Sequence, residues 1–310
     1  MINTLTLNPA VDKILYVDRF TPNITTRIKR VVDTVGGKGT HVSVNLSLLG
    51  VRTRAFGMVH GDTGRRVLSM LSQYDVELLF NEGGRGETRT NYLLNESNGD
   101  STLITEKGVP LTAKDIDAIC DTMSAHMSRG DYLVLSGDAS NCADPYVYNY
   151  MLERLKELEL VIFLDTSGES LKKCLATRPF LIKPNLDELE TLCGHAVSCD
   201  DESVLAAIRE LDGSGISVIA VSLGGDGSIV NYFGDIYRVR PPKIEISNTV
   251  GCGDSYLSGL LYGFAKGLSP ADMLRRATGI SAAAAQSEFS MGFDPGAADE
   301  LSKQVSIIKL

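Results

Sequence analysis

The stretch "NTVGCGDSYLSGLLYG", Asn248 to Gly263, joins a glycine-rich turn to an apolar segment with helical spacing. Gly251 and Gly253 allow the backbone to approach a ligand closely, and the following helix offers unpaired N–H groups and the positive end of its dipole. These features predict an anion-binding site. Asp254 lies beside it, and its carboxylate is either the N-cap of the helix or a base that accepts a hydroxyl proton. Taken locally, the sequence favours the N-cap.

Outward from this stretch, short β-branched or aliphatic runs alternate with segments of helical period. Runs such as "DYLVLSG" and "ISVIAVSLGG" are apolar on both faces, which is typical of a largely parallel sheet with helices on both sides. We therefore expect a three-layer α/β/α fold. No linker divides the chain, so residues 1–310 are expected to form a single domain.

Two segments interrupt this alternation. Residues 12–35 and 86–108 have period-two patterning and turn residues such as Asn98-Gly99, so each is expected to form a β-hairpin after an early core strand. Two such hairpins can pair into a small sheet over the mouth of the domain. We expect this sheet to act as a lid.

Composition and charge argue against several classes of function and location. The formal net charge of -9 disfavours binding to nucleic acid or to a membrane surface, and no apolar run approaches the length of a membrane span. The N-terminus lacks the pattern of a signal peptide. Six scattered cysteines without a CxxC pair suit a reducing cytosol. We therefore expect a cytoplasmic protein whose anionic ligands bind in a local basic pocket.

The sequence does not match three other glycine-containing motifs, the P-loop, the dinucleotide fingerprint and the GxSxG motif. Lys38 is followed by Gly39 rather than by Ser or Thr, and Tyr256 stands where a dinucleotide fingerprint needs its third glycine. No GxSxG motif is present. P-loop, nicotinamide and α/β-hydrolase chemistry are therefore not expected.

Polar, glycine-rich motifs instead follow the predicted strands, where many α/β sheets bind ligands. In chain order they are LNPAVD, GGKG, KPNLDE, VSLGGDGS and NTVGCGDS. This order closely resembles the ribokinase-like (phosphofructokinase B) sugar kinases over essentially the whole chain. GETRTN, DTSGESL and KPNLDELE are similar to the subgroup that contains 1-phosphofructokinase and tagatose-6-phosphate kinase.

The resemblance implies a phosphotransferase that uses ATP and Mg²⁺ and acts on an alcohol group. It makes Asp254 the catalytic base and Gly251, Cys252 and Gly253 the anion hole for the transferred phosphoryl group. It assigns contacts with the sugar hydroxyls to Asp12, Gly37 and Lys38. It implies a nucleotide side made of Lys183, Asn185, Ser222, Gly224 and Gly227, and an NxxE motif, Asn185 and Glu188, that organises Mg²⁺ through water.

Within the subgroup, the Arg of the ETR triplet contacts a phosphate already on the sugar, so Arg89 implies a phosphorylated acceptor; its alternative role is that of a solvated lid residue. The expected reaction converts fructose 1-phosphate to fructose 1,6-bisphosphate, or tagatose 6-phosphate to tagatose 1,6-bisphosphate. The resemblance and the exposed edges of a small sheet also predict a homodimer that pairs through the lids.

Three positions depart from the subgroup. His41 replaces an Asn that touches the sugar, and Asp138 replaces a serine near the sugar-phosphate pocket, where a carboxylate repels a dianion. Cys252 replaces Ala or Ser, and the helix N-terminus is expected to activate its thiol partly. The first two changes leave two alternatives open: a kinase of an unphosphorylated sugar, and a non-catalytic sensor of sugar phosphate or nucleotide.

Overall fold

In a computed structural model of the chain, which describes residues 1–137 and 139–310, ten of the described strands form one central sheet. Its order is β14-β13-β12-β11-β10-β9-β8-β1-β4-β5. The pairs from β5 to β11 are parallel, and those from β11 to β14 are antiparallel. The strands are β1 (Ile2–Thr6), β4 (Thr53–His60), β5 (Val76–Gly83), β8 (Tyr132–Ser136), β9 (Val161–Asp165), β10 (Leu181–Ile182), β11 (Val218–Ser222), β12 (Ser228–Tyr232), β13 (Asp235–Arg240) and β14 (Ser306–Lys309).

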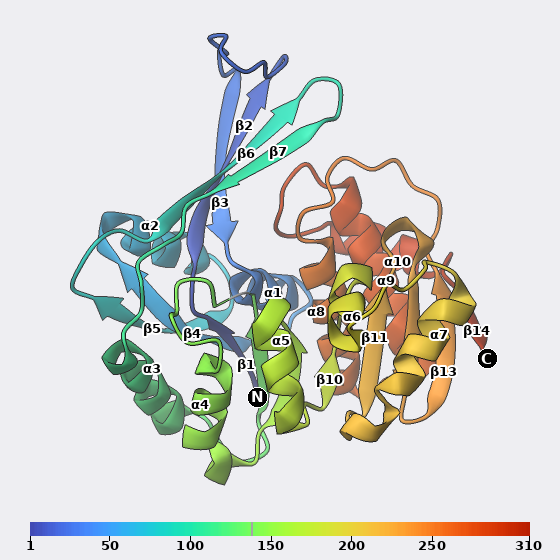
Figure 1. Cartoon of the computed structure of the whole chain (residues 1–310). Helices are drawn as coiled ribbons and strands as arrows, with labels where there is room; N and C mark the ends of the chain where they lie inside the picture. Colours follow the sequence, from blue (N-terminus) through green and yellow to red (C-terminus); the bar gives the residue numbers. More distant parts are fainter. Residues whose placement is uncertain (138) are drawn as a thin grey trace.

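Helices cover both faces of this sheet (Figure 1). Successive strand residues point to opposite faces; Leu133 and Leu135 accordingly pack under α3 to α7, whereas Val134 packs under α1, α8 and α9. The predicted three-layer architecture is confirmed. The helices are α1 (Lys38–Leu48), α2 (Gly61–Leu71), α3 (Ala113–His126), α4 (Val147–Arg154), α5 (Gly168–Cys174), α6 (Leu186–Cys193), α7 (Asp201–Glu210), α8 (Cys252–Lys266), α9 (Pro270–Gln286) and α10 (Pro295–Ser302).

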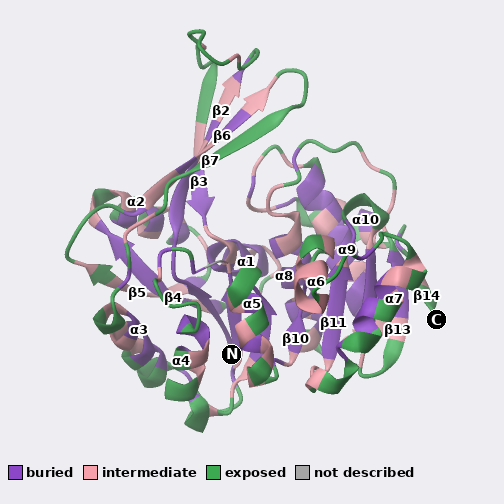
Figure 2. Cartoon of the chain, in the orientation of Figure 1, coloured by how far each residue is buried: buried purple, intermediate pink, exposed green. Residues whose placement is uncertain are grey.

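A second, four-stranded sheet projects from the body of the molecule (Figure 1). It consists of β2 (Ala10–Val17), β3 (Arg30–Gly36), β6 (Arg89–Glu96) and β7 (Ser101–Thr105), in the order β3-β2-β6-β7. The two predicted hairpins are β2–β3 and β6–β7, and they join because β2 and β6 pair in parallel. Strand β7 is exposed along its whole length, whereas the base of the sheet is buried (Figure 2).

Candidate active site

Helix α8 begins earlier than the position of Asp254. Its N-cap is Gly251, which has a φ of 83°, and a Cβ added there would lie 1.9 Å from the carbonyl oxygen of Ser290. Only glycine suits this turn. Asp254 lies in the first turn and no side chain caps the helix, so the N-cap role favoured locally by the sequence is wrong. The Cys252 N–H donates to the carbonyl oxygen of Thr249 at 3.4 Å. The next two N–H groups, those of Gly253 and Asp254, have no intrahelical partner and point toward the start of the helix.

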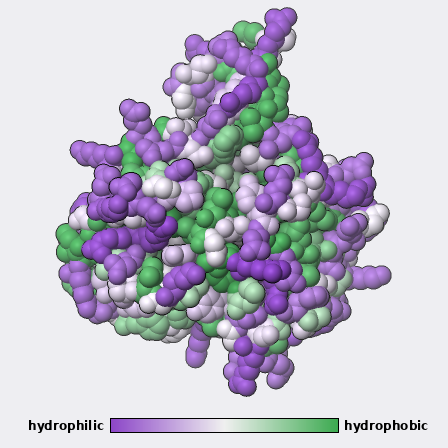
Figure 3. All heavy atoms as spheres, turned by 180° about the vertical axis from the view of Figure 1, so that it is seen from behind, coloured by the Kyte–Doolittle hydropathy of each residue, from purple (hydrophilic) through white to green (hydrophobic). Residues whose placement is uncertain are grey.

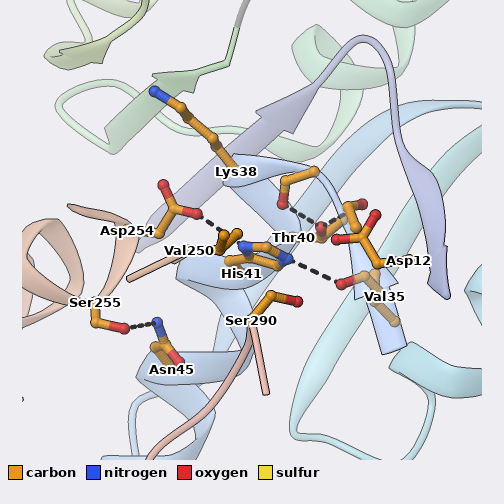
Figure 4. Close-up of polar contacts among 12 residues, drawn as sticks. Asp12, Val35, Lys38, Thr40, His41, Asn45, Val250, Asp254, Ser255 and Ser290 are labelled. Atoms are coloured by element: carbon orange, nitrogen blue, oxygen red, sulfur yellow. Dashed lines mark hydrogen bonds and ion pairs between the residues drawn. The ribbon is translucent and has the colours of Figure 1, made fainter. Parts of the chain in front are cut away.

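The carboxylate of Asp254 faces a histidine. Asp254 is only 5 % exposed, and its Oδ2 lies 2.8 Å from Nδ1 of His41 on α1 (Figure 4). Nε2 of His41 lies 2.9 Å from the carbonyl oxygen of Val35. A hydrogen bond from the ring to a sugar would therefore require one of these two contacts to break.

The charge of this histidine follows from its surroundings. Burial opposes a charged ring, but the hydrogen bond and negative charge of Asp254, with a further contribution from Asp12, raise the pKa of His41 above its ordinary value. This environment therefore favours the imidazolium form more than water does.

A buried acid holds two lysines near the start of α8. Asp165 ends β9, and its Oδ1 lies 3.2 Å from Nζ of Lys183 and 3.6 Å from Nζ of Lys38. Burial raises the pKa of Asp165, but the two ammonium groups outweigh it and hold that pKa below its ordinary value. Sequence reasoning missed Asp165 as a site residue, although an acid that ends an apolar strand is a usable signal.

The lysines give this region its positive charge. A Cβ added to Gly253 would lie 3.3 Å from Nζ of Lys183, so the ammonium group lies against the first turn of α8. The charge of Asp165 raises the pKa of Lys38 despite burial, and Asp254 and Glu188 raise it further. Lys38 and Lys183 thus place two ammonium groups beside the helix N-terminus, with Asp165 and Asp254 as nearby counter-charges.

The implied nucleotide-side residues lie at the ends of β10 and β11. Asn185 and Ser222 are neighbours in an isolated parallel bridge, and the Ser222 N–H donates to the carbonyl oxygen of Pro184 at 2.9 Å. A short turn follows in which Gly224 and Gly227 have φ values of 56° and 90°. A Cβ at Gly227 would lie 2.1 Å from the carbonyl oxygen of Val239, so this tight loop requires glycine.

Asn185 and Glu188 form a reciprocal capping box at the start of α6. The Glu188 N–H donates to Oδ1 of Asn185 at 2.8 Å, and the Asn185 N–H donates to Oε2 of Glu188 at 2.9 Å. No donor among the described residues is recorded for Oε1 of Glu188. A single free carboxylate oxygen suits Mg²⁺ held through its water shell, because this ion keeps several waters when it binds a protein.

The base of the projecting sheet carries a second buried acid. Asp12 on β2 stands opposite Asn91 on β6, and Nδ2 of Asn91 donates to Oδ1 of Asp12 at 2.7 Å. A Cβ at Gly36 would lie 2.1 Å from Oδ1 of Asp12, and the next residue, Gly37, has a φ of 112°. Sequence reasoning missed Asn91, because its role depends on the register between two distant strands.

Arg89 lies at the same base, opposite Ala10. Its Nε donates to the carbonyl oxygen of Asn8 at 3.2 Å, and its Nη1 donates to that of Glu106 at 3.4 Å. Arg89 is thus held where β2 and β6 leave the body. Asp138, expected near the sugar phosphate, lies outside the described residues.

The thiol of Cys252 is not activated. Burial and the negative charge of Asp254 raise the pKa of this thiol to about 11, despite its place at the start of α8. The expected partial activation is therefore wrong, because desolvation and a neighbouring acid outweigh the helix dipole.

A family model described as "pfkB family carbohydrate kinase" matches residues 5–293. The chain belongs to this family. A 1-phosphofructokinase of Bacillus subtilis (strain 168) is 34% identical to this pfkB enzyme over 288 residues, 93% of each chain. A tagatose-6-phosphate kinase of Staphylococcus epidermidis (strain ATCC 12228 / FDA PCI 1200) is 30% identical over 312 residues, 100% of each chain. The pfkB enzyme is therefore a phosphotransferase, and its kinase family implies ATP as the phosphoryl donor.

Solved structures agree on the fold of this pfkB enzyme. Phosphofructokinase-2 from Escherichia coli, in complex with potassium, superposes with a TM-score of 0.91 at 24% identity and covers 98% of both chains. This likeness shows the fold alone. Among the described helices, none has both the length and the apolar character needed to cross a membrane.

Proposed function

We propose that this enzyme transfers the γ-phosphoryl group of ATP to a ketohexose phosphate. The acceptor is fructose 1-phosphate, giving fructose 1,6-bisphosphate, or tagatose 6-phosphate, giving tagatose 1,6-bisphosphate. The observation that carries the proposal is the buried carboxylate of Asp254 in the first turn of α8, next to the ammonium group of Lys183. The names of the two relatives support the choice of acceptors.

In the proposed reaction, Oδ1 of Asp254 accepts the proton of the acceptor hydroxyl. The hydroxyl oxygen forms a bond to the γ-phosphorus as the bond from that phosphorus to the bridging oxygen breaks, and the electron pair leaves with ADP. The N–H groups of Gly253 and Asp254 in the first turn of α8, together with Lys183, stabilise the charge on the transferred group. Glu188 and Asn185 would hold Mg²⁺ through water, and the ion would neutralise charge on the triphosphate.

The acceptor binds at the base of the projecting sheet. Asp12 accepts hydrogen bonds from its hydroxyl groups, and the guanidinium fork of Arg89 binds its phosphate. Because the sheet stands over this site, its closure excludes water from the reacting groups. The sheet is in this sense the lid.

We also propose that two copies associate through their lid sheets. Val31 on the edge strand β3, and Leu103 and Ile104 on the edge strand β7, are each about half exposed. Figure 3 shows a hydrophobic strip (green) on the projecting sheet. Exposed apolar edge strands tend to pair with another chain.

Light scattering tests this association. Ile104→Lys is expected to halve the apparent mass, whereas Ile308→Lys, which places the same charge on the edge strand β14 of the central sheet, is expected to leave it unchanged. Equal masses for both variants and the wild type would exclude the lid as the interface. A structure of a tetrameric inhibited form is known for the E. coli phosphofructokinase-2, so a mass of four chains is a further possible outcome.

Activity is tested by a coupled assay of ADP release with ATP and Mg²⁺. The acceptors are fructose 1-phosphate, tagatose 6-phosphate, fructose 6-phosphate and the corresponding free sugars. We expect turnover of one sugar phosphate, and a loss of roughly 10²–10⁴-fold in kcat for Asp254→Asn with ATP binding retained. Turnover of free sugars alone would contradict the role of Arg89. ATP binding without any turnover would favour the sensor, and wild-type rates in Asp254→Asn would exclude Asp254 as the base.

A further inference from the structure

The ring of His41 is fixed from both sides by oxygen atoms. Nε2 lies 2.9 Å from the carbonyl oxygen of Val35, which can only accept, so Nε2 carries a hydrogen. Nδ1 lies 2.8 Å from Oδ2 of Asp254. Two bare lone pairs repel at this distance, so a proton lies between these atoms. The pair therefore holds an imidazolium and a carboxylate that share a hydrogen bond.

Charged groups on three elements face the members of this pair. The carboxylate of Asp254 faces the His41 ring from α8, and the negative charge of Asp12 on β2 also favours the imidazolium. Lys38, one turn before His41 on α1, interacts instead with the carboxylate of Asp254. The side chains of His41 and Asp254 are 6% and 7% exposed, so water scarcely screens their interaction.

The helices that carry the pair are also fixed to each other. One turn beyond His41, Nδ2 of Asn45 donates to Oγ of Ser255, the residue that follows Asp254, at 3.1 Å (Figure 4). Oδ1 of Asn45 in turn accepts from the Gly292 N–H at 3.2 Å. The imidazole therefore meets the carboxylate in one orientation.

We propose that His41 is a positioning residue that holds Oδ2 of Asp254 and thereby directs Oδ1 toward the acceptor hydroxyl. This inference rests on the proposed function, in which Asp254 is the base. In the step, the hydroxyl proton passes to Oδ1 while the imidazolium keeps its hydrogen bond to Oδ2. The hydrogen bond from the imidazolium fixes the rotamer of Asp254 that proton transfer needs.

A pH dependence follows from this arrangement. When the imidazolium loses a proton at high pH, one ring nitrogen is left bare against an oxygen atom, Nδ1 against Oδ2 or Nε2 against the Val35 carbonyl, so the ring no longer keeps both contacts. The carboxylate then loses its fixed orientation, and kcat falls. Because Asp254 and Asp12 outweigh burial and raise the pKa of His41 above its ordinary value of 6.5, the fall begins above that pH.

The decisive variant is His41→Asn, because an amide can donate to Oδ2 but does not titrate. We would measure kcat and the KM of ATP and of the acceptor from about pH 5 to about pH 9. The wild type is expected to lose kcat on the alkaline side with the slope of one proton. His41→Asn is expected to lose this alkaline fall, to retain kcat within about tenfold near neutral pH, and to leave the KM of ATP unchanged.

His126→Asn is the matched control, because His126 is exposed on α3 and its ring nitrogen Nδ1 contacts the Thr122 carbonyl of the same helix. It is expected to keep the wild-type pH profile. Coincident profiles of His41→Asn and the wild type would overturn the positioning role. Absence of wild-type turnover on every acceptor would instead overturn the proposed function.

A second measurement depends neither on turnover nor on whether a variant of His41 folds. In a nitrogen-15 NMR titration of the wild type, most of the His41 rings are expected to keep both hydrogens at pH 6.5, the ordinary pKa of histidine. In Asp254→Asn, the titration of His41 is expected to move to lower pH. A wild-type His41 ring that is mostly neutral at pH 6.5 would contradict the shared proton and overturn the inference.

Discussion

The ammonium group of Lys183 lies 3.2 Å from the carboxylate of Asp165, and both side chains are almost fully buried. Asp165→Asn removes the counter-charge from Lys183 and from Lys38. Because loss of one partner of a buried ion pair leaves a charge uncompensated, we expect the free energy of unfolding to fall by about 3–5 kcal/mol. Urea denaturation measures this change. Asp235→Asn, which breaks the exposed pair with Lys309, should cost less than about 1 kcal/mol; equal losses would contradict the assignment.

The same carboxylate predicts an acid dependence. Its pKa is lower in the folded protein than its ordinary value of 3.8, so its stabilising effect is complete above that value and is lost as the pH falls below it. The unfolding free energy of the wild type should therefore decrease more steeply than that of Asp165→Asn between about pH 5 and about pH 2. Parallel curves for the two proteins would show that Asp165 is not a linked group.

The left-handed N-cap of α8 requires glycine at position 251. Gly251→Ala forces a side chain into a left-handed conformation and against the carbonyl oxygen of Ser290, so we expect a loss of about 1–3 kcal/mol in stability and a large fall in kcat. Gly267→Ala, at the other end of the same helix, has a φ of 62° and no atom within 4 Å of its Cβ. It should lose stability but keep its kcat. A similar kcat in both variants would show that the turn at Gly251 does not contribute to catalysis.

At the base of the lid, Asn91→Ala leaves Oδ1 of Asp12 without its donor. A hydrogen bond to a charged group contributes about 1.5–3 kcal/mol, so the acceptor KM should rise by about tenfold or more while the KM of ATP stays constant. Initial-rate kinetics in both substrates make this comparison. Asn98→Ala, at the exposed tip of the same sheet, should change neither constant. An unchanged acceptor KM in Asn91→Ala would exclude this end of the sheet from the acceptor site.

Thiol labelling tests the environment of Cys252. With a pKa of about 11, fewer than about one in a thousand of these thiols is ionised near neutral pH, so iodoacetamide should modify Cys252 slowly with or without ATP. Mass spectrometry of Cys199→Ser, which removes the exposed cysteine, resolves the slower sites. Rapid labelling of Cys252 that ATP prevents would instead show that the thiol is activated.

The layers of the fold were predictable because strands such as β8 are apolar on both faces, and the β6–β7 hairpin because of its Asn98-Gly99 turn. Contacts between distant elements were not. The hydrogen bond between Asp12 and Asn91 depends on the register of β2 with β6, and that between His41 and Asp254 on the packing of α1 against α8. Helical period predicts that such helices exist, but not which of their residues meet. Likewise, the role of Asp254 was misjudged locally because the left-handed turn at Gly251 decides where α8 starts.

The parallel pairing of β2 with β6 has a consequence for folding. Each hairpin alone is a two-stranded ribbon, which is marginally stable in water. The two can support each other only after the intervening chain, α1, β4, α2 and β5, has docked on the central sheet, and contacts of such long sequence separation form late. The acceptor half of the proposed site is thus completed by a later event than the nucleotide half at β10 and β11. On progressive unfolding it should also be lost first, so a partly unfolded enzyme would still bind ATP after its hold on the sugar had gone.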